Sequence, residues 1–262
     1  MKLFIIKIGG NVLDNPQALE GFLTNFAALN GARILIHGGG AIASRIGEKL
    51  GLKPQYHNGR RITDTETLDL VTMVYGGLVN KQLVARLQAL GVNAIGLTGA
   101  DGNLLPATKR SPIPVDFGAV GDVQAGSVNT RLLQSLLSVS AVPVLAPLTH
   151  EAGSMLNTNA DTIAASVAIA LSGSFEVRLV YCFEKTGVLE DVDRPDSVIR
   201  AMNVARYQQL LKAGALHDGI LPKLENAFDA LSKGVHEVLI GDAADLMNNT
   251  GPVTVGTLIT RD

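Results

Sequence analysis

The sequence predicts an α/β fold built around a parallel sheet. A run at 33–36 that is rich in β-branched and aliphatic residues leads into three consecutive glycines at 38–40, and apolar residues then return at helical spacing. An earlier aliphatic run at 3–8 also ends in a glycine pair, and a helical pattern follows it at 16–29. A strand, a helix and a second strand in this order imply a right-handed crossover between parallel strands.

The two glycine turns are expected at one edge of that sheet, because ligands of parallel sheets bind at the carboxyl ends of the strands. Glycines let an anion approach main-chain N–H groups, and the positive end of a following helix favours negative charge. Lys7 lies inside the first aliphatic run, where burial is costly unless its ammonium meets an anion. The pattern favours a shared polyanion site. The alternative is that the glycines only permit tight turns.

Composition narrows the classes of function. The 262 residues carry 22 basic and 24 acidic side chains, a net charge of −2, so there is no reason to expect a polyanionic polymer as partner. Aromatic residues make up 4% of the chain and tryptophan is absent, which leaves few stacking platforms for nucleic acid. We therefore expect no nucleic-acid partner, and a chain long enough for one large domain or two lobes.

The chain is expected to be cytoplasmic. Cys182 is the only cysteine, so neither an intramolecular disulfide nor a cysteine metal cluster can form, and its apolar surroundings predict a buried thiol. The five histidines show no metal-ligand spacing. The N-terminus enters a strand directly and resembles no signal peptide. The longest uncharged run, 132–149, is interrupted by prolines and polar residues, so we expect no membrane span.

A polar loop at 57–64 precedes a long helix predicted at 65–90. The helix has a broad apolar face, which suggests burial against another element or a second subunit. The loop holds two adjacent arginines, Arg60 and Arg61. Taken alone such arginines are usually solvated, but near the anion edge one of them could grip a carboxylate or a phosphate.

Two further segments could add to the site. Residues 103–123 form short alternating pieces broken by prolines, which predicts a β-hairpin that either covers a substrate or only decorates the surface. Asn157, Asn159 and Asp161 precede an alanine-rich helix predicted at 162–171. One N-cap needs a single such group, so we expect Asn157 to contact substrate and Asp161 to organise charge.

The second half repeats the alternation of strands and helices without a long linker. We place a soft boundary near Gly173, and Lys223 follows Pro222 in the first turn of a helix. The other predicted elements are strands at 177–183, 238–241 and 256–259 and a helix at 204–213.

Five segments, taken in the order in which they occur, carry a family resemblance that covers nearly the whole chain. The segments are Lys7-Ile8-Gly9-Gly10-Asn11, His37-Gly38-Gly39-Gly40, Asn58-Gly59-Arg60-Arg61-Ile62-Thr63, Asn157-Thr158-Asn159-Ala160-Asp161 and Pro222-Lys223. Any one of them is a weak signal, but the ordered set resembles the N-acetylglutamate kinases of the amino acid kinase family.

The resemblance implies an open αβα sandwich with a mainly parallel central sheet and two lobes. The N-terminal lobe, 1–173, would bind an acylglutamate and dimerise through the helix at 65–90, and the C-terminal lobe, 174–262, would bind ATP. Nothing precedes the first strand, so the N-terminal helix of arginine-sensitive hexamers is missing. We expect a homodimer without that feedback control.

The resemblance also implies a reaction, in which ATP phosphorylates the γ-carboxylate of an N-acyl-L-glutamate in arginine biosynthesis. Lys7 and Lys223 would neutralise the transferring group, with Asp161 holding both. Mg²⁺ is expected on the ATP phosphates, with no dedicated protein metal site. The substrate contacts would be Gly38, Gly39, Arg61 for the α-carboxylate and Asn157 for the acylamide; the ATP contacts would be Gly10, Gly39, Lys223, Glu184 and Gly187.

The chain departs from the family pattern in the nucleotide half. Phe183-Glu184-Lys185 stands where the family usually has Thr-Asp or Ser-Asp, and Asp218-Gly219-Ile220 stands where it has Gly-Gly-Met. The acyl group stays open: acetyl is the family default, and the asparagines and the hairpin could border a succinyl group. The alternatives are another small-carboxylate or carbamate kinase of the family and a non-catalytic nucleotide-binding sensor. A dinucleotide oxidoreductase is disfavoured because neither glycine turn is a G-x-G-x-x-G motif.

Overall fold

A computed structural model describes residues 1–191, 193–194, 196–214, 216 and 220–262. The helices are α1 (Gly10–Asp14), α2 (Pro16–Ala28), α3 (Gly40–Lys49), α4 (Thr65–Val71), α5 (Asn80–Ala89), α6 (Thr130–Ser138), α7 (Ala160–Leu171), α8 (Val204–Lys212), α9 (Leu221–Ser232) and α10 (Leu246–Thr250). The strands are β1 (Lys2–Ile8), β2 (Ala32–His37), β3 (Gln55–His57), β4 (Arg60–Ile62), β5 (Ala94–Leu97), β6 (Ala107–Lys109), β7 (Gly121–Val123), β8 (Val142–Leu145), β9 (Leu148–Glu151), β10 (Ser154–Asn157), β11 (Glu176–Phe183), β12 (Ala201–Met202), β13 (Glu237–Asp242) and β14 (Thr257–Ile259).

An eight-stranded sheet forms the middle of the molecule, with strand order β12-β14-β13-β11-β1-β2-β8-β5. Neighbouring strands are parallel except β14, which runs antiparallel to β13. The predicted α/β class and the mainly parallel sheet are therefore confirmed. The central strands β1, β2 and β11 come from both halves of the chain, so one sheet runs through both predicted lobes.

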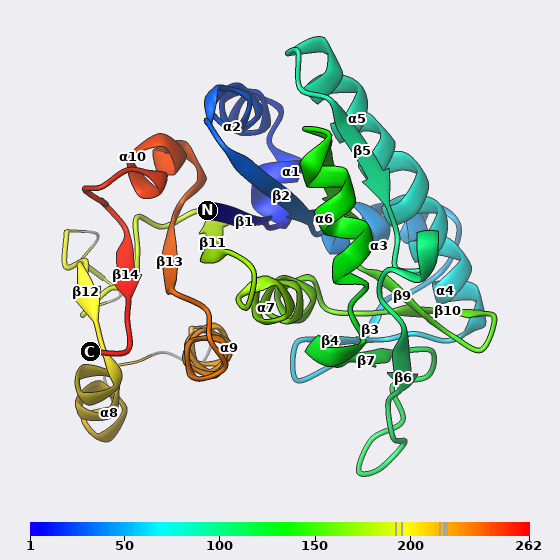
Figure 1. The fold of residues 1–262 in the computed structure, drawn as a ribbon. Coiled ribbons are helices and arrows are strands. Elements are labelled where there is room, and N and C mark those ends of the chain that lie inside the picture. Colours follow the sequence, from blue (N-terminus) through cyan, green and yellow to red (C-terminus); the bar gives the residue numbers. More distant parts are fainter. Residues whose placement is uncertain (192, 195, 215, 217–219) are drawn as a thin grey trace.

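Helices cover both faces of the sheet and complete three layers (Figure 1). Because side chains alternate along a strand, β1 serves two cores. Leu3 and Ile5 pack in one apolar cluster with buried residues of α6, α7, α8 and α9. Ile6 and Ile8 pack in the other with residues of α2, α3, α4, α5 and α10. The near-continuous apolar run of β1 is thus explained by burial on both faces.

Most elements lie where the sequence predicts them. The strands at 3–8, 33–36, 177–183 and 238–241 and the hairpin within 103–123 are all present. The predicted polar loop at 57–64 is wrong, because Arg60–Ile62 within it pairs with Gln55–His57 as the β3–β4 hairpin. A second hairpin, β9–β10, was not predicted. Both contain strands of three or four residues with many polar side chains, which leaves little alternating pattern to detect.

The predicted long helix is confirmed over 65–89, but its middle is wider than an α-helix. Residues Thr72–Val79 adopt π-helical geometry between α4 and α5. Asp64 caps its start, and the Asp64 carboxylate accepts a hydrogen bond of 2.8 Å from the Thr67 N–H. The π segment includes Tyr75, which reaches the candidate site.

The structure also bears on the expected burial of Cys182 and on membrane-spanning helices. The Cys182 thiol is buried as predicted, and that burial raises its pKa to about 12. Among the described residues, none of the helices combines the length and the apolar character that crossing a membrane requires.

Candidate active site

The two glycine turns lie side by side at the carboxyl edge of the sheet, as predicted. Ile8 pairs with His37 at the ends of β1 and β2. The Gly38 N–H donates a hydrogen bond of 3.0 Å to the carbonyl oxygen of Ile8, which joins one turn to the other. Helix α1 starts at Gly10 and α3 at Gly40, directly after these turns.

His37 fixes the second glycine turn from the interior of the protein. Its side chain is fully buried, and burial lowers its pKa to about 4, so the ring is neutral at pH 7. The Nδ1–H donates to the carbonyl oxygen of Gly38 over 2.6 Å, and Nε2 accepts from the Asn80 amide over 3.1 Å. The Asn80 amide also donates to the carbonyl oxygen of Val144 over 2.9 Å. The turn is therefore fixed to the long helix and to β8.

Gly39 has no space for a side chain. A Cβ at this position would lie 2.8 Å from Cδ1 of Tyr75 in the π-helical segment. The close approach of the ring explains why glycine is required here. It also places Tyr75 beside the turn, a neighbour that no local sequence pattern indicates.

Asp161 lies in the first turn of α7 between two lysines. Its Oδ1 is 2.7 Å from Nζ of Lys7, and its Oδ2 is 2.7 Å from Nζ of Lys223. Burial alone would raise the pKa of this carboxyl, but the two ammonium groups outweigh burial and lower the pKa from 3.8 to about 2. The predicted group of Lys7, Asp161 and Lys223 is thus brought together from β1, α7 and α9.

Arg61 is buried and held by three oxygen atoms. Its Nη2 donates to the carbonyl oxygen of Gly40 at 2.9 Å, to Oγ of Ser44 at 2.7 Å and to the Tyr56 hydroxyl at 2.6 Å. The guanidinium carbon also lies 4.9 Å from the centre of the Tyr56 ring. Arg61 is therefore a positioned cation and not a solvated one.

Asn157, at the end of β10, is fixed to the same side of the site. Its amide group donates to Oγ1 of Thr63 over 3.0 Å, and its main-chain N–H donates to the carbonyl oxygen of Ala119 over 2.9 Å. It therefore connects the segment that carries Arg61 with the β6–β7 hairpin. Asn159 serves as the N-cap of α7 and accepts from the Asp161 and Thr162 N–H groups.

These residues surround a cavity of about 290 Å³. The amino ends of α3 and α7 both line it, and each favours negative charge. Among the described residues of the lining, Asp161 is the one acidic side chain, against four basic ones. The described residues that line the cavity are Lys7, Gly9, Gly10, Gly38, Gly39, Gly40, Ala41, Tyr56, Gly59, Arg60, Arg61, Tyr75, Arg110, Val120, Pro147, Asn157, Thr158, Asn159, Ala160 and Asp161.

Three of the predicted ATP contacts lie outside this lining. Lys223 does not line the cavity, but its ammonium group pairs with Asp161, which does. Glu184 is exposed, accepts a hydrogen bond from the Asn11 amide and lines a second cavity of about 510 Å³. Gly187 is buried, and a Cβ there would lie 2.7 Å from Oγ1 of Thr257. Asp218 and Gly219, part of the altered family segment, lie outside the described residues.

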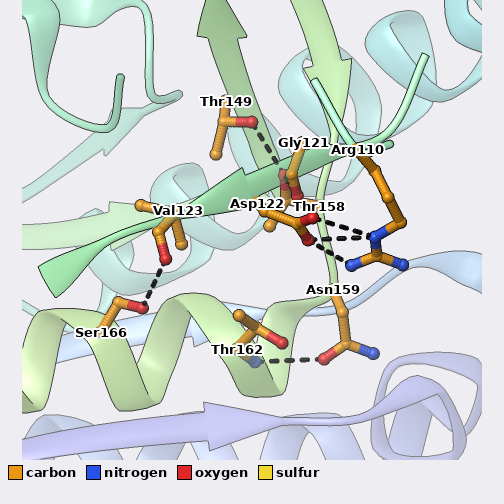
Figure 2. Close-up of polar contacts among 9 residues, drawn as sticks. All are labelled: Arg110, Gly121, Asp122, Val123, Thr149, Thr158, Asn159, Thr162 and Ser166. Atoms are coloured by element: carbon orange, nitrogen blue, oxygen red, sulfur yellow. Dashed lines mark hydrogen bonds and ion pairs between the residues drawn. The ribbon is translucent and has the colours of Figure 1, made fainter. Parts of the chain in front are cut away.

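Sequence reasoning did not select Arg110, Tyr56 or Tyr75. Tyr56 pairs with Arg61 across the β3–β4 hairpin, so only recognition of that hairpin could have indicated it. Arg110 follows β6, and Figure 2 shows its guanidinium beside Asp122 of β7, near the start of α7. The hairpin was predicted, but the sequence did not indicate which of its side chains faces the cavity.

The chain can be compared with proteins of known name. Residues 2–242 match the model of the amino acid kinase family. The acetylglutamate kinase of Cytophaga hutchinsonii is 52% identical over 260 residues, which cover 98% of this chain and 97% of that protein. The acetylglutamate kinase of Bacteroides thetaiotaomicron is 52% identical over 251 residues, which cover 95% of this chain and 97% of that protein.

Solved structures share the fold. The smu.665 protein of Streptococcus mutans superimposes with a TM-score of 0.80 at 28% identity, and the match covers 99% of both chains. N-acetylglutamate synthase of Neisseria gonorrhoeae, complexed with coenzyme A and N-acetyl-glutamate, gives a TM-score of 0.81 at 25% identity, covering 99% of this chain and 59% of that one. The family model, the close relatives and the shared fold agree, and the chain belongs to the amino acid kinase family.

Proposed function

We propose that the chain transfers the γ-phosphoryl group of ATP to the γ-carboxylate of an N-acyl-L-glutamate, in the pathway of arginine biosynthesis. The product is an acyl phosphate, and N-acetyl-L-glutamate is the acceptor that the names of the close relatives indicate. The observation that carries the proposal is the Asp161 carboxylate held between Lys7 and Lys223 at the rim of an anion-favouring cavity.

The two lysines suit phosphoryl transfer. In this reaction charge spreads over the oxygens of the transferring group, and catalysis consists of positioning and of cations placed around those oxygens. Lys7 on β1 and Lys223 on α9 would approach the group from different elements, and Asp161 fixes both ammonium groups before substrate binds. Main-chain N–H groups of Gly10 and Gly39 would contact the phosphoryl oxygens. A binding protein would have no need for two such cations.

The acceptor would occupy the other side of the cavity. Arg61 would bind the α-carboxylate, since its guanidinium is already oriented by Gly40, Ser44 and Tyr56. Gly38 and Gly39 would border the substrate, and Asn157 would contact the acylamide. A cavity of about 290 Å³ is close to the small end of ligand pockets.

ATP would bind through Gly10, Gly39, Lys223, Glu184 and Gly187, with residues 174–262 as the nucleotide lobe and 1–173 as the acceptor lobe. Within the part of the chain that is described, no three His, Cys, Asp or Glu side chains gather as a metal site. Mg²⁺ suits such a site when it keeps its waters and binds through phosphate oxygens. Bound in that way, it would neutralise charge on the ATP phosphates.

We further propose a homodimer formed through the helix at 65–89. Met73 and Leu78 lie on its π-helical segment and are 61% and 42% exposed. Large apolar side chains exposed on a helix are typical of a surface that another subunit covers.

The test of the reaction is ADP release together with trapping of the acyl phosphate as a hydroxamate. The acceptors compared are N-acetyl-L-glutamate, N-succinyl-L-glutamate, free L-glutamate and L-aspartate, each with Mg-ATP. Turnover and hydroxamate with an acylated glutamate, and none with free glutamate or aspartate, are expected. ATP binding without hydroxamate from any acceptor would contradict the proposal and favour a nucleotide-binding sensor.

A further inference from the structure

We propose that Arg110 selects the acyl group of the acceptor by binding a carboxylate at its far end. The inference rests on the proposed function, because it concerns the acyl group of the same N-acyl-L-glutamate. It means that a dicarboxylic acyl group of the succinyl type is bound in preference to acetyl. Four observations carry it: where Arg110 lies, how its guanidinium is held, which of its donors are left, and the charge of the cavity.

Arg110 lies next to the part of the site assigned to the acylamide. Val120 forms a bridge with Asn157 and lines the cavity. The Arg110 main-chain N–H donates to the carbonyl oxygen of this same Val120 over 2.8 Å. Arg110 is therefore one strand beyond Asn157 and itself lines the cavity. An acyl chain that extends past the amide towards the hairpin would approach it.

The guanidinium is held in place before any ligand arrives. Its Nε donates to Oδ1 and Oδ2 of Asp122 over 3.0 and 3.2 Å, and its Nη2 also donates to Oδ1. The ring centre of Phe117 lies 5.4 Å from the guanidinium carbon. The Arg110 side chain is only 19% exposed. It differs in this from a freely solvated surface arginine.

The hairpin is in turn fixed to the helix that carries Asp161. Figure 2 shows this attachment: the Thr158 hydroxyl donates to the carbonyl oxygen of Gly121 over 2.9 Å, and the Ser166 hydroxyl on α7 donates to that of Val123 over 3.4 Å. The position of Arg110 is thus set relative to the reacting end of the cavity. Preorganised contacts of this kind give specificity at low entropic cost.

Arg110 keeps donors for a ligand. Asp122 occupies the Nε and Nη2 edge of the guanidinium, and within the described chain Nη1 donates to no acceptor. Asp122 is not among the lining residues, whereas Arg110 is. A guanidinium has five N–H donors, so it can be held by Asp122 on one edge and bind a second carboxylate on another.

N-acetyl-L-glutamate would leave the Arg110 guanidinium without a ligand carboxylate. That acceptor has two carboxylates, one for Arg61 and one at the reacting end near Lys7. Arg110 lines the cavity as a further positioned cation, and acetyl offers it only a methyl group. A terminal acyl carboxylate would form a charge-assisted hydrogen bond with it.

The experiment measures the binding of three acceptors by isothermal titration calorimetry, with turnover recorded in parallel. The ligands are N-acetyl-L-glutamate, N-succinyl-L-glutamate and N-succinamoyl-L-glutamate, in which a neutral amide replaces the terminal carboxylate. The proteins are wild type, Arg110→Met, Arg110→Lys and, as matched control, Lys109→Met. Lys109 is exposed on the same hairpin and does not line the cavity.

Wild type is expected to bind the succinyl compound at least about 10-fold more tightly than the other two. Arg110→Met should weaken succinyl binding by about 10- to 100-fold, the range for a hydrogen bond to a charged group, while acetyl binding changes less than about 3-fold. Unchanged acetyl binding also shows that the variant is folded. Arg110→Lys should keep part of the preference, and Lys109→Met all of it.

The inference is overturned if wild type binds the acetyl or succinamoyl compound as tightly as the succinyl compound. It is also overturned if Arg110→Met weakens all three by the same factor or affects only ATP. Failure of the proposed function would be seen in the turnover measurement, as a wild-type protein that binds an acceptor but does not turn it over. A wild-type protein that binds none of the three would contradict both.

Discussion

At the scale of single residues, the site depends on one carboxylate that serves two cations. Within the described chain, Lys7 and Lys223 share Asp161 as their ion-pair partner. Its lowered pKa means that it stays ionised far below neutral pH. Because the folded-state pKa is below the unfolded value, Asp161 stabilises the protein at pH values above about 4. That stabilisation is lost as the pH falls towards about 2.

The pH dependence can be measured by comparing wild type with Asp161→Asn in urea unfolding. A fall in pKa from 3.8 to about 2 corresponds to a contribution of about 2 kcal/mol at pH 6. The difference in unfolding free energy between the two proteins should be about 1 kcal/mol smaller at pH 3. Asp229→Asn is the control, since its pair with Lys233 is half-exposed. A difference independent of pH would contradict the account.

Much of the candidate site could be predicted from residue types in chain order. Lys7, Arg61, Asn157 and Asp161 were selected, and the structure brings them to one cavity. They stand at strand ends, glycine turns and helix starts, where sequence position largely determines which edge a residue faces. Arg110 and the two tyrosines depend on the tertiary placement of hairpins and of a π-helical turn, which local pattern does not encode.

At the scale of elements, the β6–β7 hairpin is joined to the segment that carries Arg61. The Thr63 N–H donates to the carbonyl oxygen of Phe117 over 2.9 Å, and the Ala119 N–H donates to that of Thr63 over 2.7 Å. Between these two bonds lies Gly118, with a φ of +71°. The hairpin is therefore fixed to the side of the cavity that is proposed to bind the acceptor, and it is not only a surface decoration.

Gly118→Ala should separate these two segments. A Cβ at this position would lie 2.2 Å from the carbonyl oxygen of Thr63, and the positive φ adds strain. We expect the KM for the acylglutamate to rise about 10-fold or more, as expected from losing about 1.4 kcal/mol of binding, with little change in KM for ATP. The control is Gly126→Ala, where a Cβ meets nothing within 4 Å. Equal KM values in the two variants would contradict this role for the hairpin.

The long helix shows what an element-level prediction misses. Its extent followed from its apolar periodicity, but the π-helical turn at Thr72–Val79 did not. A π-helical turn changes which side chains face inward, and Tyr75 of this segment packs on Gly39. The two unpredicted hairpins, β3–β4 and β9–β10, likewise consist of short polar strands. In each case the signal lies in tertiary contacts rather than in local periodicity.

At the scale of the whole molecule, one sheet connects the two proposed lobes. β1 lies between β2 and β11, so Lys7 stands where the halves of the chain meet. Asp161 and Lys223 reach the same point from helices in different halves. This arrangement would let one lobe present ATP and the other an acceptor to the same pair of lysines.

The proposed dimer predicts that a charge on the long helix separates the subunits. Met73→Asp places a carboxylate on the exposed face of the helix at 65–89 and should give a monomer in sedimentation velocity, since an unpaired buried charge is costly. Met247→Asp is the matched control, because Met247 is 44% exposed on α10. A wild-type monomer, or a Met73→Asp dimer, would exclude this interface.

The measurement that tests the central claim most directly is the turnover of Lys7→Met and Lys223→Met with saturating Mg-ATP and acylglutamate. Each should lower kcat on the order of a hundredfold or more, the effect of removing one preorganised stabilising group. Lys233→Met should turn over like wild type, because Lys233 lies at the C-cap of the helix that carries Lys223 and pairs with the exposed Asp229. Wild-type turnover in either Lys7→Met or Lys223→Met would contradict the account.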